Sequence, residues 1–297
     1  MASGTQESGT QETVCHADSA QHLRARVVSH HQVAEATWRI RLDCPSIAAQ
    51  AVPGQFAMLR IPDRSDPLLA RPLAVYDTFS EGGVRRFADF LYAVHGRFTK
   101  ALTGVRVGDD LTIWGPLGNG FRLPAADHLL LVAGGIGQTA LLALARERLG
   151  AARYGIPARN VPRAARVTFC WGARHAGMFA DADDFRAAGC DVHLATLDGS
   201  AGVHGTVIDL LDQVFAAGLD AAATQVACCG PEPMMAAVAR WARARATRCA
   251  VSLETPMACG VGICFTCVAR IRDAAGGWDY RRTCIEGPVF DAEQVEW

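Results

Sequence analysis

Four cysteines close to the end of the chain have the spacing of ligands to a metal cluster. The pattern C-x4-C-x2-C-x16-C is formed by Cys259, Cys264, Cys267 and Cys284. The first three fit the spacing of plant-type [2Fe–2S] clusters, in which thiolates hold the iron. Gly260 and Gly262 let the backbone between the first two cysteines wrap closely, so that its N–H groups can donate to sulfur. The spacing predicts a redox centre in this segment.

A zinc ion on the same four cysteines is the first alternative, and buried free thiols are the second. Structural zinc sites usually carry two short C-x2-C knuckles, whereas this segment has one. The last gap is shorter than in free plant-type ferredoxins, so the segment is not a whole ferredoxin domain. The spacing favours the iron–sulfur cluster and leaves the two alternatives open.

A glycine-rich turn at Gly134, Gly135 and Gly137 has the position of a phosphate-binding loop. It follows the apolar run His128–Ala133 and precedes the Ala- and Leu-rich segment Ala140–Leu149. In such a turn, backbone N–H groups and a helix dipole can meet a pyrophosphate. The pattern is not G-x-G-x-x-G, so the Rossmann fingerprint is absent and a plain strand–helix turn is the alternative.

A second loop of the same kind contains Cys229 and Gly230. It ends the apolar run Thr224–Cys229 and precedes the helical pattern Met234–Arg245. Ligands of open α/β sheets bind outside the carboxyl ends of strands, so two such loops support each other as one nucleotide site. Cys229 is the candidate to contact a nicotinamide ring, and the alternative is an inert core thiol. Cys228 faces the other way and is expected in the core.

Residues 23–124 are typical of β structure. The expected strands are Arg24–Val28, Thr37–Leu42, Gln55–Ile61, Leu73–Phe79, Phe87–Val94 and Asp110–Trp114, with a short helix at Thr99–Leu102. Several short strands at this spacing predict a small antiparallel barrel. His30 and His31 are expected in a loop exposed to water.

Residues 125–248 alternate between strand and helix patterns. The expected strands are His128–Ala133, Arg166–Trp171, Asp191–Thr196 and Thr224–Cys229, and the expected helices are Ala140–Leu149, Val207–Phe215 and Met234–Arg245. Such alternation predicts a parallel α/β sheet.

Residues 249–297 are too few to form a stable fold without a cross-link such as a metal site. Residues 1–22 repeat Ser-Gly-Thr-Gln-Glu and are expected to be disordered. The predicted fold class is therefore α+β multidomain.

Composition excludes several function classes. The 29 basic and 30 acidic residues nearly balance, which argues against a nucleic-acid binder and a polybasic membrane anchor. No apolar stretch approaches the roughly 18 residues of a membrane helix. The N-terminus lacks the apolar region of a secretory signal, so a cytoplasmic, thiol-reducing location is expected. Lys100 is the single lysine, and no P-loop sequence is present.

The order of these features resembles the ferredoxin-reductase superfamily. More closely, it resembles the iron–sulfur flavoprotein electron-transfer subunits of class B dihydroorotate dehydrogenase. The resemblance runs from Arg24 to the C-terminus. It rests on Gly115–Phe121, Thr196–Ser200, Gly205, Val207, Cys229–Met234, Ser252–Glu254, Met257–Cys267 and Cys284–Phe290.

The resemblance implies three cofactors. It places FAD in the barrel of residues 23–124, at Arg71, Pro72, Leu73, Ala74, Val75, Gly96, Thr99 and Gly115. It places NAD(P) in the α/β domain of residues 125–248, over Gly134, Gly135, Gly137 and Gly230, with Cys229 as the catalytic contact to the nicotinamide. It places a [2Fe–2S] cluster in residues 249–297, on the four cysteines. The implied partner is an FMN-containing or other redox catalytic subunit, in a hetero-oligomer without nucleic acid or membrane.

The sequence departs from the family at three places. Ala74 stands where the family usually has Ser or Thr, Phe98 stands where Gly often precedes Thr99, and Gln138-Thr139-Ala140 replaces a Pro-rich sequence. These departures leave room for a relative that serves a different partner.

The implied function is an electron relay. FAD exchanges a hydride with the nicotinamide and single electrons with the cluster, and the protein orients and tunes these cofactors. The first alternative is an NAD(P)H-dependent reductase component for an oxygenase or another oxidoreductase. A zinc-stapled interaction module is the second. The sequence leaves open the choice of NAD or NADP and the direction of electron flow.

Overall fold

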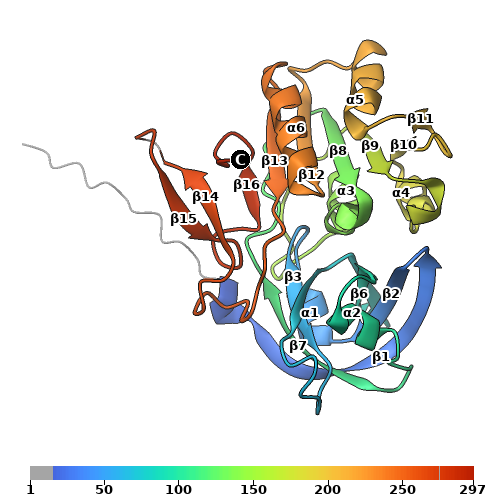
Figure 1. The fold of residues 1–297 in the computed structure, drawn as a ribbon, viewed down its shortest axis with the longest axis vertical. Coiled ribbons are helices and arrows are strands. Elements are labelled where there is room, and N and C mark those ends of the chain that lie inside the picture. Colours follow the sequence, from blue (N-terminus) through green and yellow to red (C-terminus); the bar gives the residue numbers. More distant parts are fainter. Residues whose placement is uncertain (1–15, 274) are drawn as a thin grey trace, which may run out of the picture.

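The computed structural model describes residues 16–273 and 275–297. In this part of the chain there are two seven-stranded sheets and one two-stranded hairpin, arranged as shown in Figure 1. Residues 1–15 of the predicted disordered tail lie outside the described residues. Residues 16–22 contradict that prediction, because His16–Ser19 form a 3₁₀ turn and the first strand begins at Gln21.

The first sheet is antiparallel and curls into a half-barrel. Its described strands follow the order β4-β3-β7-β1-β2-β6-β5. They are β1 (Gln21–Ala34), β2 (Thr37–Asp43), β3 (Phe56–Arg60), β4 (Arg71–Ala74), β5 (Asp77–Glu81), β6 (Val84–Ala93) and β7 (Asp110–Leu117). Helices α1 (Pro45–Gln50) and α2 (Arg97–Leu102) add Ile47, Phe98 and Leu102 to its core. The predicted antiparallel barrel is confirmed in this curled form.

The two edge strands of this sheet, β4 and β5, are joined by Val75 and Tyr76 alone, and this short connection explains why the sheet curls. Chain of this length reaches at most about 11 Å from the Cα of Ala74 to that of Asp77, so the edges must approach each other. The N–H of Val75 donates to the carbonyl of Gln55 beside β3, and the N–H of Tyr76 donates to the backbone carbonyl of Asp89 in β6, both at 2.9 Å. The predicted single strand Leu73–Phe79 is therefore wrong, because the chain changes edges in its middle.

The second sheet is parallel except at one edge. Within the described residues its order is β11-β10-β9-β8-β12-β13-β16, and only β16 runs antiparallel to its neighbour. The strands are β8 (His128–Gly134), β9 (Arg166–Ala173), β10 (Asp191–Thr196), β11 (Val203–His204), β12 (Thr224–Cys229), β13 (Arg248–Ser252) and β16 (Val289–Asp291). The predicted parallel α/β sheet is confirmed.

Helices cover both faces of this sheet. Side chains alternate along each strand, so Leu129 and Leu131 pack with α3 (Leu142–Arg148) and α4 (Ala182–Ala188). Leu130 and Val132 pack on the other side with α5 (Val207–Ala216) and α6 (Glu232–Arg243). The helix predicted over Ala140–Leu149 begins only at Leu142, because Gly135–Ala140 form a 3₁₀ turn first.

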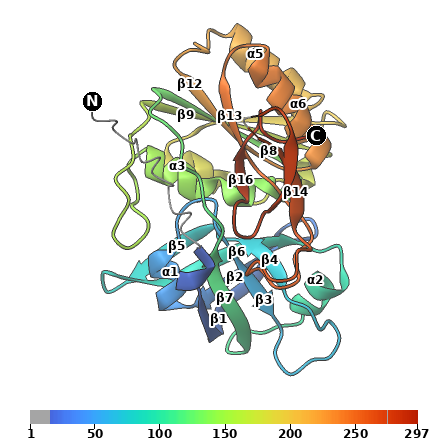
Figure 2. The ribbon, with the colours of Figure 1, turned by 90° about the vertical axis from the view of Figure 1, so that its left-hand side faces the viewer.

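The C-terminal segment joins the two sheets. Its hairpin, β14 (Val268–Arg272) and β15 (Trp278–Arg282), projects at the side of the molecule, while β16 pairs with β13 in the parallel sheet. The boundary predicted at residue 249 falls inside β13. Figure 2 shows this segment in front of the junction between the two sheets.

Ion pairs connect the half-barrel to α4 across this junction. Arg39 of β2 contacts Asp89 of its own sheet at 2.7 Å, and Asp181 and Asp184 at 3.0 and 2.9 Å. The hydroxyl of Tyr76 donates to Asp184 at 3.1 Å. Because Asp89 is 1% exposed at its side chain, this contact fixes a buried charge at the interface.

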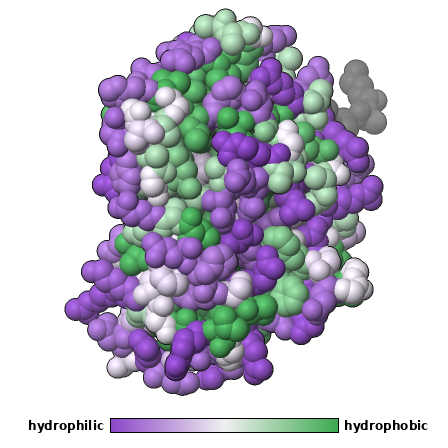
Figure 3. All heavy atoms as spheres, turned by 90° about the vertical axis from the view of Figure 1, so that its right-hand side faces the viewer, coloured by the Kyte–Doolittle hydropathy of each residue, from purple (hydrophilic) through white to green (hydrophobic). Residues whose placement is uncertain are grey.

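The outer surface is largely polar on the face turned away from the hairpin. Figure 3 shows hydrophilic side chains over most of that face, with hydrophobic ones in separate groups. In the described part of the chain, the helices are all too short or too polar to span a bilayer.

Candidate cofactor and cluster sites

The two predicted glycine loops meet at the carboxyl edge of the parallel sheet. Cys229 at the end of β12 is paired with Ala133 of β8 on one side and with Ser252 of β13 on the other. Gly134 is the last residue of β8 and is paired with Gly172 of β9. The structure thus brings together the residues predicted to bind a nicotinamide nucleotide.

Three of these glycines are required by the packing of the loops on each other. A Cβ atom at Gly137 would lie 2.2 Å from the carbonyl oxygen of Cys229. One at Gly134 would lie 2.3 Å from the sulfur of Met234, and one at Gly230 would lie 2.9 Å from the backbone nitrogen of Gly134. Larger residues would push the loops apart, so these glycines keep one shared edge.

Gly135 differs because it faces open space. It has a φ of +53°, which suits glycine, and nothing lies within 4 Å of the position of a Cβ atom. Its carbonyl oxygen accepts a hydrogen bond from Trp171 Nε1 at 2.8 Å, which holds the turn in place. A bound nucleotide would therefore find exposed backbone at Gly135, and this position fits the predicted phosphate contact.

Cys229 lies at the same edge with a neutral thiol. Burial raises its pKa to about 12, so the thiol stays protonated at neutral pH. The side chain packs against the core that lies between the two sheets. Cys228 packs on the opposite face and is buried, as predicted. A protonated, half-buried Cys229 is suited to contact a ring rather than to act as a nucleophile.

The predicted flavin strand is β4, next to β3 in the half-barrel. Met58 is paired with Pro72, Ala57 with Leu73 and Phe56 with Ala74. Ala74 packs on the same hydrophobic core as Cys229. The end of the predicted flavin strand and the predicted nicotinamide contact therefore border one core.

Three flavin candidates have local structural partners. Arg71 is exposed, and its guanidinium donates to the carbonyls of Leu69 and Ala70 at 3.3 and 2.9 Å. Val75 is buried in the half-barrel core. Gly115 lies in β7, where a Cβ atom would be 3.0 Å from that of Ala57, and β3 separates it from β4. The structure does not group Gly115 with the other flavin candidates.

Gly96 and Thr99 form the start of α2. The hydroxyl of Thr99 accepts from the backbone N–H groups of His95 and Gly96 at 3.1 and 3.0 Å. Space is open where Gly96 lacks a side chain. Phe98, the departure from the family pattern, is buried in the half-barrel core. The turn fits a phosphate contact at Gly96, while Thr99 shapes the turn.

The four predicted cluster ligands lie as two pairs of thiols. The sulfurs of Cys267 and Cys284 are 3.2 Å apart and buried, whereas Cys264 is exposed and close to Cys259. Among the described residues, no three His, Cys, Asp or Glu side chains gather closely enough to form a metal-ion site. The four sulfurs come from one loop and the turn packed under it, and such a donor set suits iron–sulfur clusters and zinc.

Hydrogen bonds prepare this loop for thiolates. Thr266 donates to Cys264 and lowers the pKa of that thiol to about 6, and the Cys284 thiol lowers that of Cys267 to about 6. The neighbouring Cys267 raises the pKa of Cys284. Metal ligands must be deprotonated, so the low pKa values favour binding. The N–H of Val261 donates to the Cys259 sulfur at 3.4 Å, as expected from the glycine-rich backbone.

The cluster loop docks on the half-barrel through two residues that the sequence did not single out. The indole Nε1 of Trp114 in β7 donates to the carbonyl of Cys259 at 2.9 Å. A Cβ atom at Gly260 would lie 2.6 Å from Cγ of Met58. Since Met58 is paired with Pro72, the cluster loop contacts β3, the strand next to the predicted flavin strand. The only signal in the sequence for Met58 and Trp114 was that each is a large side chain in a predicted strand.

The linker between the sheets holds the other end of the segment. The Asn119 side chain donates to the carbonyls of Glu286 and Val289 at 3.1 and 2.8 Å, and accepts from the N–H of Val289 at 3.1 Å. The motif Gly115–Phe121 therefore supports the cluster segment as well as leading from one sheet to the other.

Exposed apolar side chains flank the outermost cysteine, Cys264, in the sequence: Ile263 (79% exposed) and Phe265 (61%). Trp278 (46%) and Tyr280 (57%) are exposed on β15 of the neighbouring hairpin. Large exposed apolar groups of this kind are typical of interaction surfaces.

Comparison with known proteins agrees with this arrangement. Residues 254–296 match the family model of the iron–sulfur cluster binding domain of dihydroorotate dehydrogenase B. The electron transfer subunit of dihydroorotate dehydrogenase B (NAD(+)) from Shouchella clausii is 36% identical over 276 residues, which is 92% of this chain and 97% of that protein. The chain belongs to this family of electron transfer subunits. The subunit from Desulforamulus reducens is 34% identical over 92% of this chain and 97% of its own length.

Solved structures show the same fold as this electron transfer subunit. A structure of the NADH-dependent reduced ferredoxin-NADP oxidoreductase superposes with a TM-score of 0.75 at 28% identity, covering 92% of this chain and 90% of that one. The ferredoxin reductase of carbazole 1,9a-dioxygenase superposes with a TM-score of 0.62 at 21% identity, over 77% and 67% of the two chains. The ferredoxin-reductase-like fold of the chain is thus shown.

Proposed function

We propose that this subunit relays electrons between a nicotinamide nucleotide, FAD, a [2Fe–2S] cluster and a partner catalytic subunit of the dihydroorotate dehydrogenase type. One observation carries the proposal. Ala74, at the end of the flavin strand, shares a core with Cys229, while Met58 contacts both the cluster loop and the strand that carries Pro72. The three predicted sites therefore follow one another through adjacent parts of the chain.

The chain supplies position and environment to this relay. FAD, when bound, exchanges two electrons with a nicotinamide and single electrons with an iron–sulfur cluster. Residues 23–124 hold FAD along Arg71–Val75 and at Gly96, and residues 125–248 hold the nucleotide at Gly134–Gly137 and Gly230. Cys229 excludes water from the nicotinamide face with an uncharged thiol. Cys259, Cys264, Cys267 and Cys284, in residues 249–297, hold the cluster.

The partner docks where the cluster is closest to the surface. Cys264 is exposed, and Ile263 and Phe265 beside it in the sequence, together with Trp278 and Tyr280 on β15 of the hairpin, offer exposed apolar side chains to a protein. We propose an FMN-containing catalytic subunit as the partner, in a hetero-oligomer. A cytoplasmic location, predicted from the sequence, stays a prediction.

The oxygenase-reductase alternative has weaker support. The likeness to the reductase of carbazole 1,9a-dioxygenase, at 21% identity, is a likeness of fold. The likeness to electron transfer subunits covers 92% of the chain at 36% identity. The residues that leave room for a partner other than the family's own are the departures at Ala74, Phe98 and Gln138-Thr139-Ala140.

An anaerobic visible spectrum of the purified protein, before and after addition of NADH, tests the proposal. We expect flavin bands and broad cluster absorption that NADH bleaches. The flavin should then reduce the partner subunit when it is added. A colourless, zinc-containing protein would contradict the relay, provided that loss of cofactor during purification is excluded by reconstitution with FAD, iron and sulfide.

A further inference from the structure

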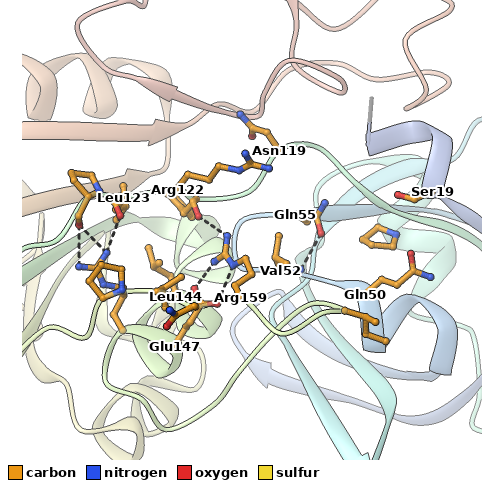
Figure 4. Close-up of a pocket in the computed structure, with 18 of the residues that line it drawn as sticks. Ser19, Gln50, Val52, Gln55, Asn119, Arg122, Leu123, Leu144, Glu147 and Arg159 are labelled. Carbon is orange, nitrogen blue, oxygen red and sulfur yellow. Dashed lines mark hydrogen bonds and ion pairs between the residues drawn. The ribbon is translucent and has the colours of Figure 1, made fainter. Parts of the chain in front are cut away.

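A cavity of about 720 Å³ lies beside the linker that connects the two sheets. Its walls are the linker Arg122–Pro124, the end of α3, the loop at residues 156–162 and the segment after α1. None of the residues predicted to bind a cofactor or the cluster lines it. Its volume is that of a small-molecule site, which usually ranges from about 300 to about 1,000 Å³. Figure 4 shows Arg122, Arg159 and Glu147 on one side, facing Gln50 and Gln55.

The lining carries an excess of positive charge. Four arginines and a single carboxylate line the cavity: Arg122, Arg148, Arg159, Arg248 and Glu147. Arg159 pairs with Glu147, with 3.1 Å between Nε and Oε1. Arg122 and Arg248 are exposed, and neither forms an ion pair within residues 16–273 and 275–297. The cavity thus offers cations that the described chain does not neutralise.

Arg148 adds a second, independent observation. Its residue is 1% exposed, and its Nη1 donates to the carbonyls of Leu123 and Pro124 at 3.3 and 3.1 Å. Its Nε has no hydrogen-bond partner among the described residues. Burial lowers the pKa of Arg148, and the neighbouring Glu147, which raises it, does not cancel this effect. A buried guanidinium with an unpartnered donor is costly, and an anion in the cavity would offset that cost.

We propose that this cavity binds a small organic phosphate. The phosphate faces the forked guanidinium of Arg122, which has no ion pair among the described residues, and the unpartnered Nε of Arg148, while Arg159 stays paired with Glu147. The organic part lies on the apolar wall of Val52, Leu144 and Ile156. Because the walls come from the half-barrel, the linker and the parallel sheet, a bound ligand bridges both halves of the protein. This inference does not depend on the proposed electron relay.

Calorimetric titration of the holoprotein with cytidine monophosphate tests this proposal. Cytidine monophosphate lacks the adenine of FAD and NAD and so does not mimic them. We expect saturable binding of one molecule per chain, undiminished by saturating NADH, and weaker binding of inorganic phosphate. Arg122→Ala should weaken binding about tenfold, the loss of a hydrogen bond to a charged group. Arg106→Ala is the matched control, because Arg106 is exposed and lies outside the lining.

Four results would each overturn the proposal. They are no binding at millimolar cytidine monophosphate, displacement of that ligand by NADH, equal affinities in the Arg122→Ala and Arg106→Ala variants, and inorganic phosphate binding as tightly as the nucleotide. Both substitutions are at exposed positions, so far-UV circular dichroism should show that each variant folds.

Discussion

The indole of Trp114 donates a hydrogen bond to the carbonyl of Cys259 at 2.9 Å, across 145 positions of sequence. This bond ties the first predicted cluster ligand to strand β7 of the half-barrel. A neutral hydrogen bond of this kind contributes roughly 0.5–1.5 kcal/mol. The position of the cluster loop over the half-barrel is therefore set in part by a residue outside the cysteine motif.

Trp114→Phe should loosen this loop without changing its ligands. We expect iron to be lost to a chelator a few times faster than from the unchanged protein, roughly in line with one lost hydrogen bond. The FAD content should stay constant. The measurement is the iron content over time, with Trp38→Phe, in the half-barrel but away from the cysteines, as the control. Equal rates of loss in both variants would show that the bond does not hold the cluster loop.

Cys264→Ser should abolish stable cluster binding, because a hydroxyl does not supply the thiolate that iron requires. Iron and acid-labile sulfide should both fall to near the background of the assay. Cys249→Ser serves as the control, since Cys249 is buried in the core of the parallel sheet and is not one of the four predicted ligands. Full iron content in Cys264→Ser would remove Cys264 from the ligand set.

Gly137→Ala should impair nucleotide binding by forcing the two glycine loops apart. The new methyl would lie 2.2 Å from the Cys229 carbonyl oxygen, and overpacking of this kind costs roughly 1–3 kcal/mol. We expect a raised NADH concentration for half-maximal flavin reduction. Gly104→Ala is the control, because its methyl would lie at an ordinary 3.5 Å from the nearest atom. An unchanged response in Gly137→Ala would argue that the loops do not hold the nucleotide.

Arg39→Gln should destabilise the junction between the sheets. It leaves the buried Asp89 with Arg41 as its remaining ion-pair partner and removes the contacts to Asp181 and Asp184. Breaking a buried pair costs about 3–5 kcal/mol, and the remaining Arg41 contact favours the lower end. Urea unfolding measures this. Arg24→Gln should cost under about 1 kcal/mol, because its pair with Asp63 is exposed.

The stability of the protein should fall as the pH drops below about 6.5, in part because of His30. Its Nδ1 donates to the carbonyl of Val105 at 2.8 Å, so Nε2 accepts from the Tyr92 hydroxyl at 2.7 Å and the ring is neutral. Burial lowers the pKa of His30 below its usual 6.5. The unfolded chain thus takes up a proton at a higher pH than the folded one, which favours unfolding in acid.

Urea unfolding at about pH 7.5 and about pH 5.5 checks this effect. His30→Gln, which cannot take up the proton, should lose less stability on acidification than the unchanged protein. Equal losses would assign the acid sensitivity to other groups, such as His128, whose pKa burial also lowers.

The sequence predicted elements that depend on local signals. Strand Thr224–Cys229 has the predicted bounds, and α5 begins at Val207 as predicted, because Thr206 and Asp209 cap its start. The expectation for His30 was wrong, since it lies in β1 and is partly buried. Nothing in the neighbouring residues indicates that β1 continues through it or that Tyr92, on another strand, meets its ring.

The order of the sites followed from motifs, but their contacts did not. The break between β4 and β5 depends on which strands form the sheet edges, and that is decided by pairing between distant segments. The support of the cluster loop by Met58 and Trp114 likewise depends on packing between residues far apart in sequence. The sequence spacing identified the four cysteines because ligands of one cluster must lie close together. The same spacing carries no information on which residues of the half-barrel contact the cluster loop.

The pairing of β16 with β13 has a consequence for biosynthesis. All strands of the half-barrel lie within the first 117 residues, so this half can form early as the chain leaves the ribosome. The parallel sheet obtains its last strand only at Val289–Asp291, after all four cysteines have been made. Closing that edge therefore comes after the half-barrel strands and the other six strands of the parallel sheet have been made. A ribosome that stops before Val289 leaves β13 with an open edge, which is a template for aggregation.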